Sequence, residues 1–249
     1  MSIFSDIIKA LAKVGDKKKH YTSAIVLAGG SGTRMGSATT KQMLILSGMP
    51  IVVRSILAFE ACELIDEIII VAKEDEMLSY KQFADDYGFK KVKAVVKGGE
   101  TRQDSVFAGL RKLSPKCEYI AIHDGARPLV TNENIVKTVE AAYKYHCACA
   151  ACPAKDTVKI ATALDYIEST PDRARVWNAL TPQIFRAEIY RAAAYTAKKD
   201  GYAGTDDCSL VEPLGFKIKL IDCGYENIKI TTPEDLLTAE RILEKRNAK

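Results

Sequence analysis

The sequence predicts an α/β protein built on a doubly wound, mostly parallel sheet from which a β-arm protrudes. Apolar runs of strand length alternate along much of the chain with helical segments, and the connections between them are short. Glycine-rich turns follow two of the predicted strands. Over residues 153–175 the alternation stops, and a stretch with charged residues and no helical periodicity takes its place.

The first strand and the turn after it are the most informative part of the chain. Residues 24–28 (Ala-Ile-Val-Leu-Ala) form an unbroken apolar run, typical of a parallel strand covered on both faces. Glycines follow at positions 29, 30, 32 and 36, and they let backbone N–H groups approach an anion closely. Arg34 and Lys41 add two cations to the same loop. We therefore predict a polyphosphate-binding loop rather than a purely structural turn.

Two familiar glycine motifs are excluded for this loop. The dinucleotide-binding fingerprint would need a glycine at the position of Met35. The Walker loop needs a Gly-Lys pair, and none follows this strand. A different class of phosphate-binding turn is therefore expected.

The elements after this loop follow one another in a regular order. Residues 43–46 form a short strand or a turn, and Pro50 opens a helix, since a helix start does not need the N–H that proline lacks. Strands are predicted at 67–72, 92–96, 119–122 and 148–152, and helices at 51–62, 75–87, 103–113 and 133–145. Ligands bind at the carboxyl ends of strands in such sheets. The glycine loop and the turns at 98–102 and 123–127 should therefore converge on one crevice.

The second half of the chain departs from this pattern. Residues 153–175 include a Pro-Asp turn and are predicted to form an extended hairpin arm, of a kind that often exchanges with a second subunit. Residues 177–185 lead into a helix at 187–199. Thr205, Asp206 and Asp207 cap a short helix. Short strands are predicted at 216–221 and 227–231, and a last helix starts at Pro233.

Two units are predicted along the chain, an N-terminal amphipathic extension at 1–22 and one domain at 23–249. Apolar residues repeat at helical spacing in the extension and basic residues follow them, whereas a secretory signal would place its charges first. The extension packs either on a partner or on the domain, and the sequence leaves both open. No apolar run is long enough to span a membrane, so no membrane association is expected.

Charge and cysteine content narrow the possible functions. The net charge of +4 is mild for a nucleic-acid binder but suits anionic small substrates. Of the seven cysteines, Cys147, Cys149 and Cys152 lie close together but lack a second Cys/His pair at zinc-finger distance. We interpret them as core side chains rather than metal ligands. Unpaired cysteines indicate a reducing, cytoplasmic location.

Charged side chains near the predicted crevice are candidates for the chemistry. Asp124 ends an apolar strand, where a carboxylate either holds Mg²⁺ together with phosphate oxygens or forms a turn. We favour the metal role because a phosphate loop lies in the same sheet. Arg127 would bond the glycine loop or a substrate, or neutralise Asp124. Lys229 lies between isoleucines on a predicted strand, which by itself favours a solvated face over a site cation.

The second glycine turn carries polar groups as well. Gly99, Glu100 and Ser105 surround it, and exposed backbone groups there can read the edge of a base, with a plain β-to-α loop as the alternative. His123 is interpreted as a histidine at the end of a strand that satisfies the hydrogen-bonding groups of a loop. Because the chain has only three histidines, no Ser-His-Asp or Cys-His catalytic set can be built.

Seven motifs occur in an order that matches a known family. The first, Gly-Gly-x-Gly-x-Arg-Met-Gly followed by a lysine, resembles the signature of sugar-nucleotide pyrophosphorylases and related Rossmann-like nucleotidyltransferases. The full set resembles the 2-C-methyl-D-erythritol 4-phosphate cytidylyltransferases over roughly residues 23–245. The motifs are residues 28–36 with Lys41, and residues 98–105, 123–128, 155–157, 179–183, 205–207 and 227–235.

The resemblance implies transfer of CMP from CTP to methylerythritol phosphate, with Mg²⁺ as cofactor and a homodimer joined through the arm. It implies that Arg34, Lys41 and Lys229 stabilise the α-phosphate of CTP. The implied CTP-binding residues are Ala28, Gly29, Gly30, Gly99, Glu100, Ser105 and Asp124. Asp124 is implied to lie beside the metal and the ribose. The sugar phosphate is assigned to Thr157 and Arg173 of the arm, in the partner's site, and to Arg127.

Two other functions fit parts of this pattern. Ribitol 5-phosphate cytidylyltransferases share the glycine loop, and a non-catalytic nucleotide-sensing module could keep the same fold. Thr40 and Glu226 depart from the family, which often has Pro and Asp there, and Glu226 leaves any second metal ligand open. The acceptor phosphate is already ionised at neutral pH, so no general base is expected. Catalysis would rest on positioning and charge neutralisation.

Overall fold

A computed structural model of the chain describes residues 19–30 and 40–248. Most of the predicted N-terminal extension lies outside the described residues, as does the glycine loop beyond Gly30, including Arg34. The backbone of Lys41 is described, but its side chain is not. The predictions made for these parts therefore stay predictions.

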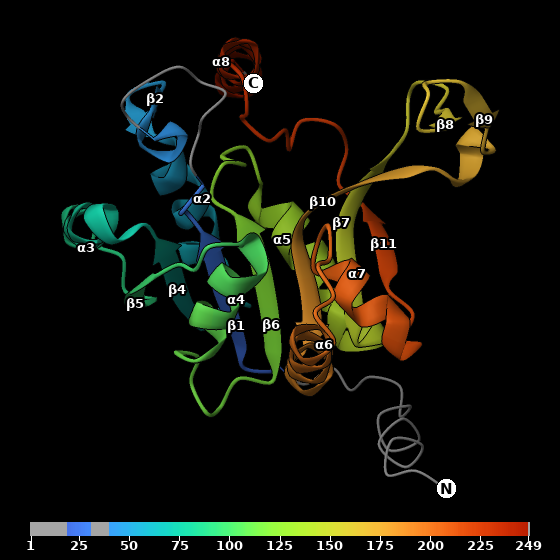
Figure 1. Ribbon diagram of the computed structural model, residues 1–249. Helices are drawn as coiled ribbons and strands as arrows, with labels where there is room; N and C mark the ends of the chain where they lie inside the picture. Colours follow the sequence, from blue (N-terminus) through green and yellow to red (C-terminus); the bar gives the residue numbers. More distant parts are fainter. Residues whose placement is uncertain (1–18, 31–39, 249) are drawn as a thin grey trace, which may run out of the picture.

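A seven-stranded sheet forms the centre of the molecule, in the order β11-β7-β10-β6-β1-β4-β5 (Figure 1). All neighbouring strands are parallel except β10, which runs antiparallel to both of its neighbours. The strands are β1 (Thr22–Leu27), β4 (Glu67–Ala72), β5 (Val92–Lys97), β6 (Tyr119–Asp124), β7 (Cys147–Pro153), β10 (Trp177–Arg186) and β11 (Lys219–Asp222). The predicted mostly parallel α/β sheet is confirmed.

Helices cover both faces of this sheet, as its strands require. In β1, Ile25 packs into one apolar cluster while Ala24 and Val26 pack into another on the opposite face. The first cluster takes side chains from α4 (Arg102–Leu110) and α6 (Ala187–Lys199), and the second from α2 (Ile51–Glu60), α3 (Met77–Asp86) and α5 (Asn132–Tyr145). A strand buried on both faces needs a continuous apolar run, which residues 24–28 supply.

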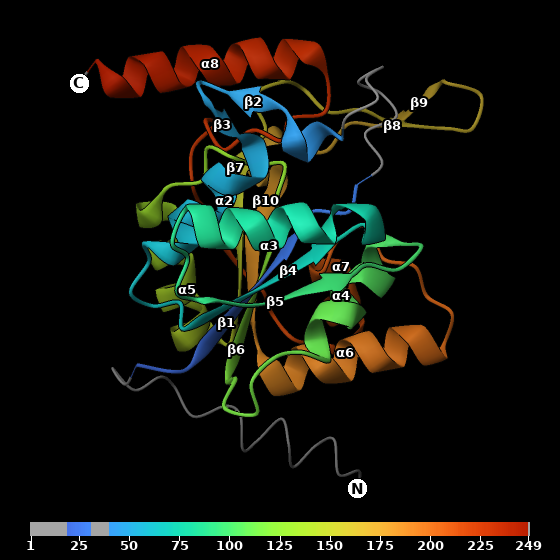
Figure 2. The same ribbon diagram turned by 90° about the vertical axis from the view of Figure 1, so that its left-hand side faces the viewer.

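Short elements complete the fold. They are η2 (Lys41–Met43), β2 (Ile45–Leu46), β3 (Met49–Pro50), η3 (Glu74–Glu76), η4 (Arg173–Arg175), α7 (Cys208–Val211) and η5 (Glu212–Leu214). The last helix, α8 (Pro233–Asn247), begins at a capping box made by Thr232 and Asp235. It lies over β2 and β3 (Figure 2), where Ala239 and Leu46 share a small apolar cluster.

The long strand β10 was not predicted, because residues 177–185 were interpreted as a lead into the next helix. Pro182 within this stretch argues against a central strand, since it cannot donate to the ladder. In the structure the pairing with β7 shifts register between Ala179 and Gln183, so that the proline falls where the ladder is interrupted. A ten-residue strand therefore passes through the middle of the sheet despite the proline.

The strand predicted at 227–231 is also wrong, because this segment has no regular secondary structure. Individual hydrogen bonds, rather than pairing with a neighbouring strand, bind its backbone N–H and carbonyl groups. The Asn227 carbonyl accepts a hydrogen bond from Arg127, and the Ile230 N–H donates to the Ala126 carbonyl. With Ile230 wholly buried, these contacts fix the segment against the end of β6.

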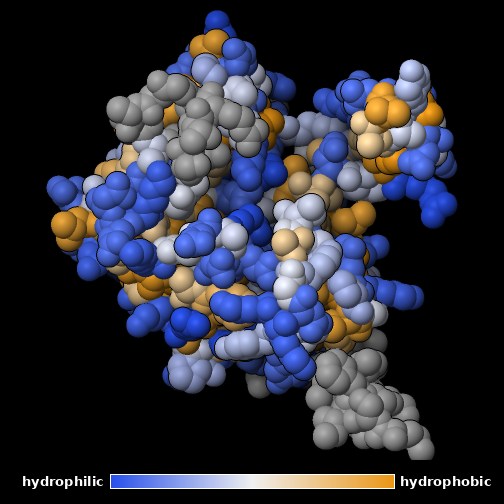
Figure 3. All heavy atoms as spheres, in the orientation of Figure 1, coloured by the Kyte–Doolittle hydropathy of each residue, from blue (hydrophilic) through white to orange (hydrophobic). Residues whose placement is uncertain are grey.

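The predicted β-arm is confirmed. Its strands, β8 (Ile160–Ala161) and β9 (Ile167–Ser169), pair antiparallel and project away from the body of the molecule (Figure 1). Apolar side chains gather on this projection (Figure 3), where Leu164 is 78% exposed and Ile167 is 65% exposed. The arm thus carries apolar surface that its own chain leaves in contact with solvent.

The cysteines behave as core residues. Cys147, Cys149 and Cys152 are buried in β7, and all seven cysteines are free thiols. No group of three potential metal ligands occurs in the described ranges. Within the same ranges, no helix has the length and apolar character needed to cross a lipid bilayer.

Candidate active site

A pocket of about 340 Å³ opens at the carboxyl ends of the parallel strands. The glycine loop, the turn at 98–102 and the turn after β6 all contribute to it, so the predicted convergence is confirmed. It is lined by Leu27, Gly29, Gly30, Gln42, Gly99, Glu100, Thr101, Arg102, Ser105, Asp124, Ala126 and Lys229. None of these described lining residues is a histidine or a cysteine, and the lining combines charged side chains, hydroxyl groups and glycine backbone.

The second glycine turn forms one wall of the pocket. The Gly99 N–H donates to the Ser105 hydroxyl oxygen at 3.2 Å, which closes the turn. A Cβ on Gly99 would collide with Asp104, so only glycine allows this close approach to the start of α4. Thr101 caps the helix by accepting a hydrogen bond from the Asp104 N–H. These local bonds hold the turn open toward the pocket.

Three cations surround the carboxylate of Asp124, which also lines the pocket. Lys229 Nζ lies 2.9 Å from one carboxylate oxygen and Arg127 Nε lies 3.8 Å from the same oxygen, while Arg102 Nε lies 3.4 Å from the other. Burial acts to raise the pKa of Asp124, but Arg102, then Lys229 and Arg127, hold that pKa well below its usual range. Asp124 is therefore ionised at neutral pH, and the cluster keeps an excess of positive charge that suits an anionic ligand.

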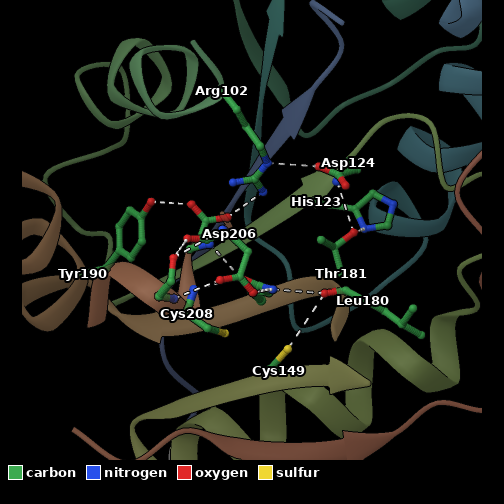
Figure 4. A network of polar contacts seen from close by, with 12 residues as sticks. Arg102, His123, Asp124, Cys149, Leu180, Thr181, Tyr190, Asp206 and Cys208 are labelled. Carbon is green, nitrogen blue, oxygen red and sulfur yellow. Dashed lines mark hydrogen bonds and ion pairs between the residues drawn. The ribbon is translucent and has the colours of Figure 1, made fainter. Parts of the chain in front are cut away.

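A buried hydrogen-bond chain fixes the end of β6 (Figure 4). The Thr181 hydroxyl oxygen accepts from the Asp124 N–H at 3.2 Å and lies 2.9 Å from His123 Nδ1. The Arg127 carbonyl, 3.3 Å from Nε2, can only accept, so Nε2 carries the proton of the neutral ring and Nδ1 accepts from the Thr181 hydroxyl. Burial lowers the pKa of His123 to about 3, so the ring is neutral at physiological pH. His123 satisfies a loop, as predicted.

Arg127 lies behind Asp124 rather than in the pocket wall. Its Nη1 donates to the Asn227 carbonyl at 2.9 Å, and its side chain is 11% exposed. Burial lowers the pKa of Arg127 despite the opposing charge of Asp124. The structure thus gives it the predicted neutralising contact with Asp124, whereas its sugar-phosphate role stays a prediction.

Lys229 reaches the pocket, which the sequence pattern alone did not favour. The expected alternation of a strand is absent from residues 227–231, so it does not determine where the side chain points. The lysine is 38% exposed and pairs with Asp124. Its side chain is therefore a site cation at the pocket wall rather than part of a solvated face.

The two predicted arm residues lie apart from this pocket. Thr157 and Arg173 are exposed, and neither is among the described residues that line the pocket of their own chain. Arg173 Nη1 donates to the Lys155 carbonyl at 3.3 Å, so the two limbs of the arm meet at its base.

Three side chains of the site were missed by sequence reasoning. Arg102 lines the pocket, although only its place in a motif was noted. Asp207 was interpreted as a helix cap, but its carboxylate accepts hydrogen bonds from Arg102 and Tyr190 instead. Gln42 lines the pocket, is 2% exposed and has no partner for its amide oxygen among the described residues. Arg102 follows a glycine turn at a strand end as Arg34 does, and this parallel is the signal that would have identified it.

Comparisons with known proteins agree with this geometry. The family model of 2-C-methyl-D-erythritol 4-phosphate cytidylyltransferase matches residues 22–245. The enzyme of that name from Caldanaerobacter subterraneus subsp. tengcongensis is 45% identical over 90% of this chain and 99% of its own length. The one from Geobacillus kaustophilus is 45% identical over 90% and 98%.

A solved structure shows the same fold. The 4-diphosphocytidyl-2C-methyl-D-erythritol synthase from Anaerococcus prevotii superposes with a TM-score of 0.82 at 33% identity, over 91% of this chain and 97% of that one. The family match spans nearly the whole described domain and includes every element that forms the pocket. The chain therefore belongs to the 2-C-methyl-D-erythritol 4-phosphate cytidylyltransferase family.

Proposed function

We propose that this chain transfers CMP from CTP to 2-C-methyl-D-erythritol 4-phosphate, a step in the supply of isoprenoid precursors. The products are 4-diphosphocytidyl-2-C-methyl-D-erythritol and pyrophosphate. One observation carries the proposal: residues from the glycine loop, the second glycine turn, Asp124 and Lys229 line a single pocket inside the region that the family model matches.

The nucleoside end of CTP would lie against the two glycine turns. Gly99, Glu100 and Ser105 present backbone and hydroxyl groups at one end of the pocket, where they suit the polar edge of cytosine. Gly29 and Gly30 line the floor after β1, and Ala28 precedes them. Backbone groups without bulky side chains allow the nucleotide to approach closely.

The phosphates would lie toward Asp124 and Lys229. In the reaction, a phosphate oxygen of the acceptor attacks the α-phosphorus of CTP, a new P–O bond forms, and the bond to the β-phosphate oxygen breaks to release pyrophosphate. We assign Lys229, together with Arg34 and Lys41 of the glycine loop, to the negative charge that develops at the α-phosphate. Because the attacking oxygen is already ionised, no protein base is required, which fits a pocket wall with no histidine among its described residues.

Asp124 would hold Mg²⁺. Asp124 lines the pocket and its cationic neighbours keep it ionised, and a single carboxylate joined by phosphate oxygens and waters is a common ligand set for this ion. When bound, the ion would neutralise part of the triphosphate charge. The residues of this chain would orient it through Asp124, whose backbone and side chain are both fixed by hydrogen bonds and ion pairs.

The sugar phosphate would be bound by the arm of a second copy of the chain. Thr157 and Arg173 are exposed on the arm and do not line their own pocket, while the arm exposes Leu164 and Ile167. A second subunit would cover these apolar side chains and receive the arginine, a good bidentate ligand for phosphate. Arg127 would support the site from behind Asp124, and we keep it as a candidate for the sugar phosphate.

Pyrophosphate release tests this function. The purified protein is incubated with Mg²⁺ and CTP and with either methylerythritol phosphate or ribitol 5-phosphate. We expect release with the first acceptor, little with the second, and none in excess chelator. Preference for ribitol 5-phosphate would reassign the acceptor, full activity in chelator would remove the metal, and CTP binding without turnover would indicate a nucleotide sensor.

A further inference from the structure

Arg102 connects the pocket to the protein core through a network that the reaction described above does not use. Its Nη2 donates to Asp207 at 2.6 Å, and its Nε lies 3.4 Å from Asp124. On the far side, the Tyr190 hydroxyl donates to Asp207 at 2.5 Å. Figure 4 shows Arg102 between Asp124 and the segment that carries Asp206 and Cys208, with Tyr190 beyond it.

Burial of the Asp207 carboxylate is energetically unfavourable unless other groups compensate its charge. Its side chain is 1% exposed, and a buried carboxylate is tolerated only when it is paired with a cation and hydrogen-bonded. Arg102 is its cationic partner, and no second cation pairs with it among the described residues. Burial acts to lower the pKa of Arg102, but Asp207 and Asp124 together raise it, so the guanidinium stays charged.

The backbone around Asp207 is fixed as firmly as its side chain. Gln183 of β10 accepts hydrogen bonds through Oε1 from the N–H groups of Asp207 and Cys208, both at 3.0 Å. Tyr190 of α6 is 1% exposed and stacks on Phe185 with ring centroids 5.1 Å apart. Asp207 thus holds the Arg102 guanidinium against the core. Its side chain makes no capping hydrogen bond to α7, so a role as helix cap does not explain its position.

The three cations around Asp124 differ in what else holds them. Arg102 is tied to Asp207, and Arg127 is tied to the Asn227 carbonyl. Lys229 is 38% exposed and has no partner other than Asp124 among the described residues. An incoming phosphate can therefore take Lys229 away from Asp124 at little cost, whereas moving Arg102 would leave the Asp207 charge buried and unpaired.

We propose that Arg102 is a positioning residue: clamped from behind by Asp207 and Tyr190, it keeps the Asp124 carboxylate in place while Lys229 exchanges Asp124 for a ligand phosphate. This inference rests on the proposed function, because it assumes that a nucleoside triphosphate enters this pocket. It adds a buried support, Asp207 with Tyr190, that lies outside the pocket lining.

Replacement of Asp207 separates this role from simple electrostatics. Asp207→Asn removes a negative charge next to a pocket for an anion, so long-range electrostatics alone predicts tighter CTP binding. Loss of the clamp predicts the opposite, weaker CTP binding and lower turnover. CTP affinity is measured by calorimetry with Mg²⁺ and no acceptor, and kcat/KM is measured separately.

In a double-mutant cycle of Arg102 and Asp207, we expect the losses of kcat/KM to be non-additive. We expect Arg102→Gln to lower kcat/KM about a hundredfold and Asp207→Asn about tenfold, with the double variant no worse than Arg102→Gln alone. Tyr190→Phe keeps every charge and should lower kcat/KM a few-fold. The matched control is Arg111→Gln, because Arg111 is exposed and lies at the other end of α4. Its kcat/KM should equal that of the wild type.

Several results would overturn the positioning role. They are tighter CTP binding by Asp207→Asn, additive losses in the double variant, or a lower melting temperature with unchanged kcat and CTP affinity in the folded fraction. Arg102→Lys covers the case in which Asp207→Asn does not fold. A lysine keeps the charge but replaces the planar guanidinium, whose Nη2 and Nε face two carboxylates, by a single nitrogen, so we expect at least a tenfold loss of kcat/KM, and wild-type activity would refute the clamp.

Assays of the wild-type protein distinguish a failure of the proposed function from a failure of the positioning role. Absence of CTP binding and of pyrophosphate release by the wild type would reject both the function and the inference that rests on it. Normal wild-type turnover with an additive cycle would reject the positioning role alone.

Discussion

The pocket and the arm place charged side chains in opposite ways. In the pocket, Asp124 is 12% exposed at its side chain and has cations on both carboxylate oxygens, with buried Thr181 and His123 behind it. On the arm, Thr157 and Arg173 are exposed, and the hairpin between them pairs through only a few residues. The pocket is organised within a single chain, while the arm leaves Thr157 and Arg173 in solvent.

This difference indicates where the missing organisation comes from. A short two-stranded hairpin is marginally stable alone, and this one also exposes Leu164 and Ile167. A surface on a second copy would order the arm and bury those side chains. Pocket variants should therefore change chemistry without changing assembly, and arm variants should change acceptor binding without changing CTP binding.

The largest effect is expected from Lys229→Ala. Removing one preorganised cation from a phosphoryl-transfer site costs about 3 kcal/mol or more, roughly a hundredfold in turnover. The melting temperature should stay near the wild-type value, because Arg102 and Arg127 still neutralise Asp124. Steady-state turnover and thermal melting are compared with Lys245→Ala, a lysine that is 68% exposed on α8. Near-normal turnover of Lys229→Ala would remove this residue from the mechanism.

An intermediate effect is expected from Arg173→Ala. Loss of a charge-assisted contact to phosphate should raise the KM for the sugar phosphate about tenfold or more, while CTP affinity stays unchanged. Arg175→Ala is the matched control, since Arg175 lies in the same short helix and is also exposed. Equal weakening of CTP binding would mean that the arm acts through the fold of the pocket.

The smallest effect concerns acid stability and His123. The folded-state pKa of about 3 lies below the ordinary value near 6.5, so the stability that depends on a neutral ring is present above pH 6.5 and is lost as pH falls toward 3. Between pH 7 and pH 5 this amounts to about 2 kcal/mol. Denaturant titrations of wild type and His123→Gln at both pH values should show the smaller loss in the variant. Equal losses would mean that the pKa of His123 is the same in the folded and the unfolded protein.

The site at the carboxyl ends of the strands was predictable from the sequence, because short local patterns identify those ends. Apolar runs that end in glycines or in Asp124 identify strands and their carboxyl ends, and parallel strands bring those ends together. The pocket follows from that rule without knowledge of any contact. The protruding arm was predictable for a similar reason, because the alternation of strands and helices stops where it begins.

What was missed depends on contacts between distant residues. Arg102 and Asp207 are 105 positions apart, and no local pattern distinguishes a helix cap from the anchor of an arginine. Strand β10 contains a proline that is tolerated only because the neighbouring ladder shifts register. Lys229 lies in a segment held by single hydrogen bonds to the end of β6, so strand periodicity gave the wrong expectation for its side chain.

The decisive measurement is activity in mixed dimers of Lys229→Ala and Arg173→Ala, assayed below the KM for the sugar phosphate. Under these conditions each variant alone is expected to keep about a tenth of the wild-type activity or less. After subunit exchange, half of the dimers are mixed and each has one site with an intact pocket and an intact arm, so about a quarter of the wild-type activity should return. No recovery after proven exchange would contradict a shared site and would mean that the arm serves its own chain.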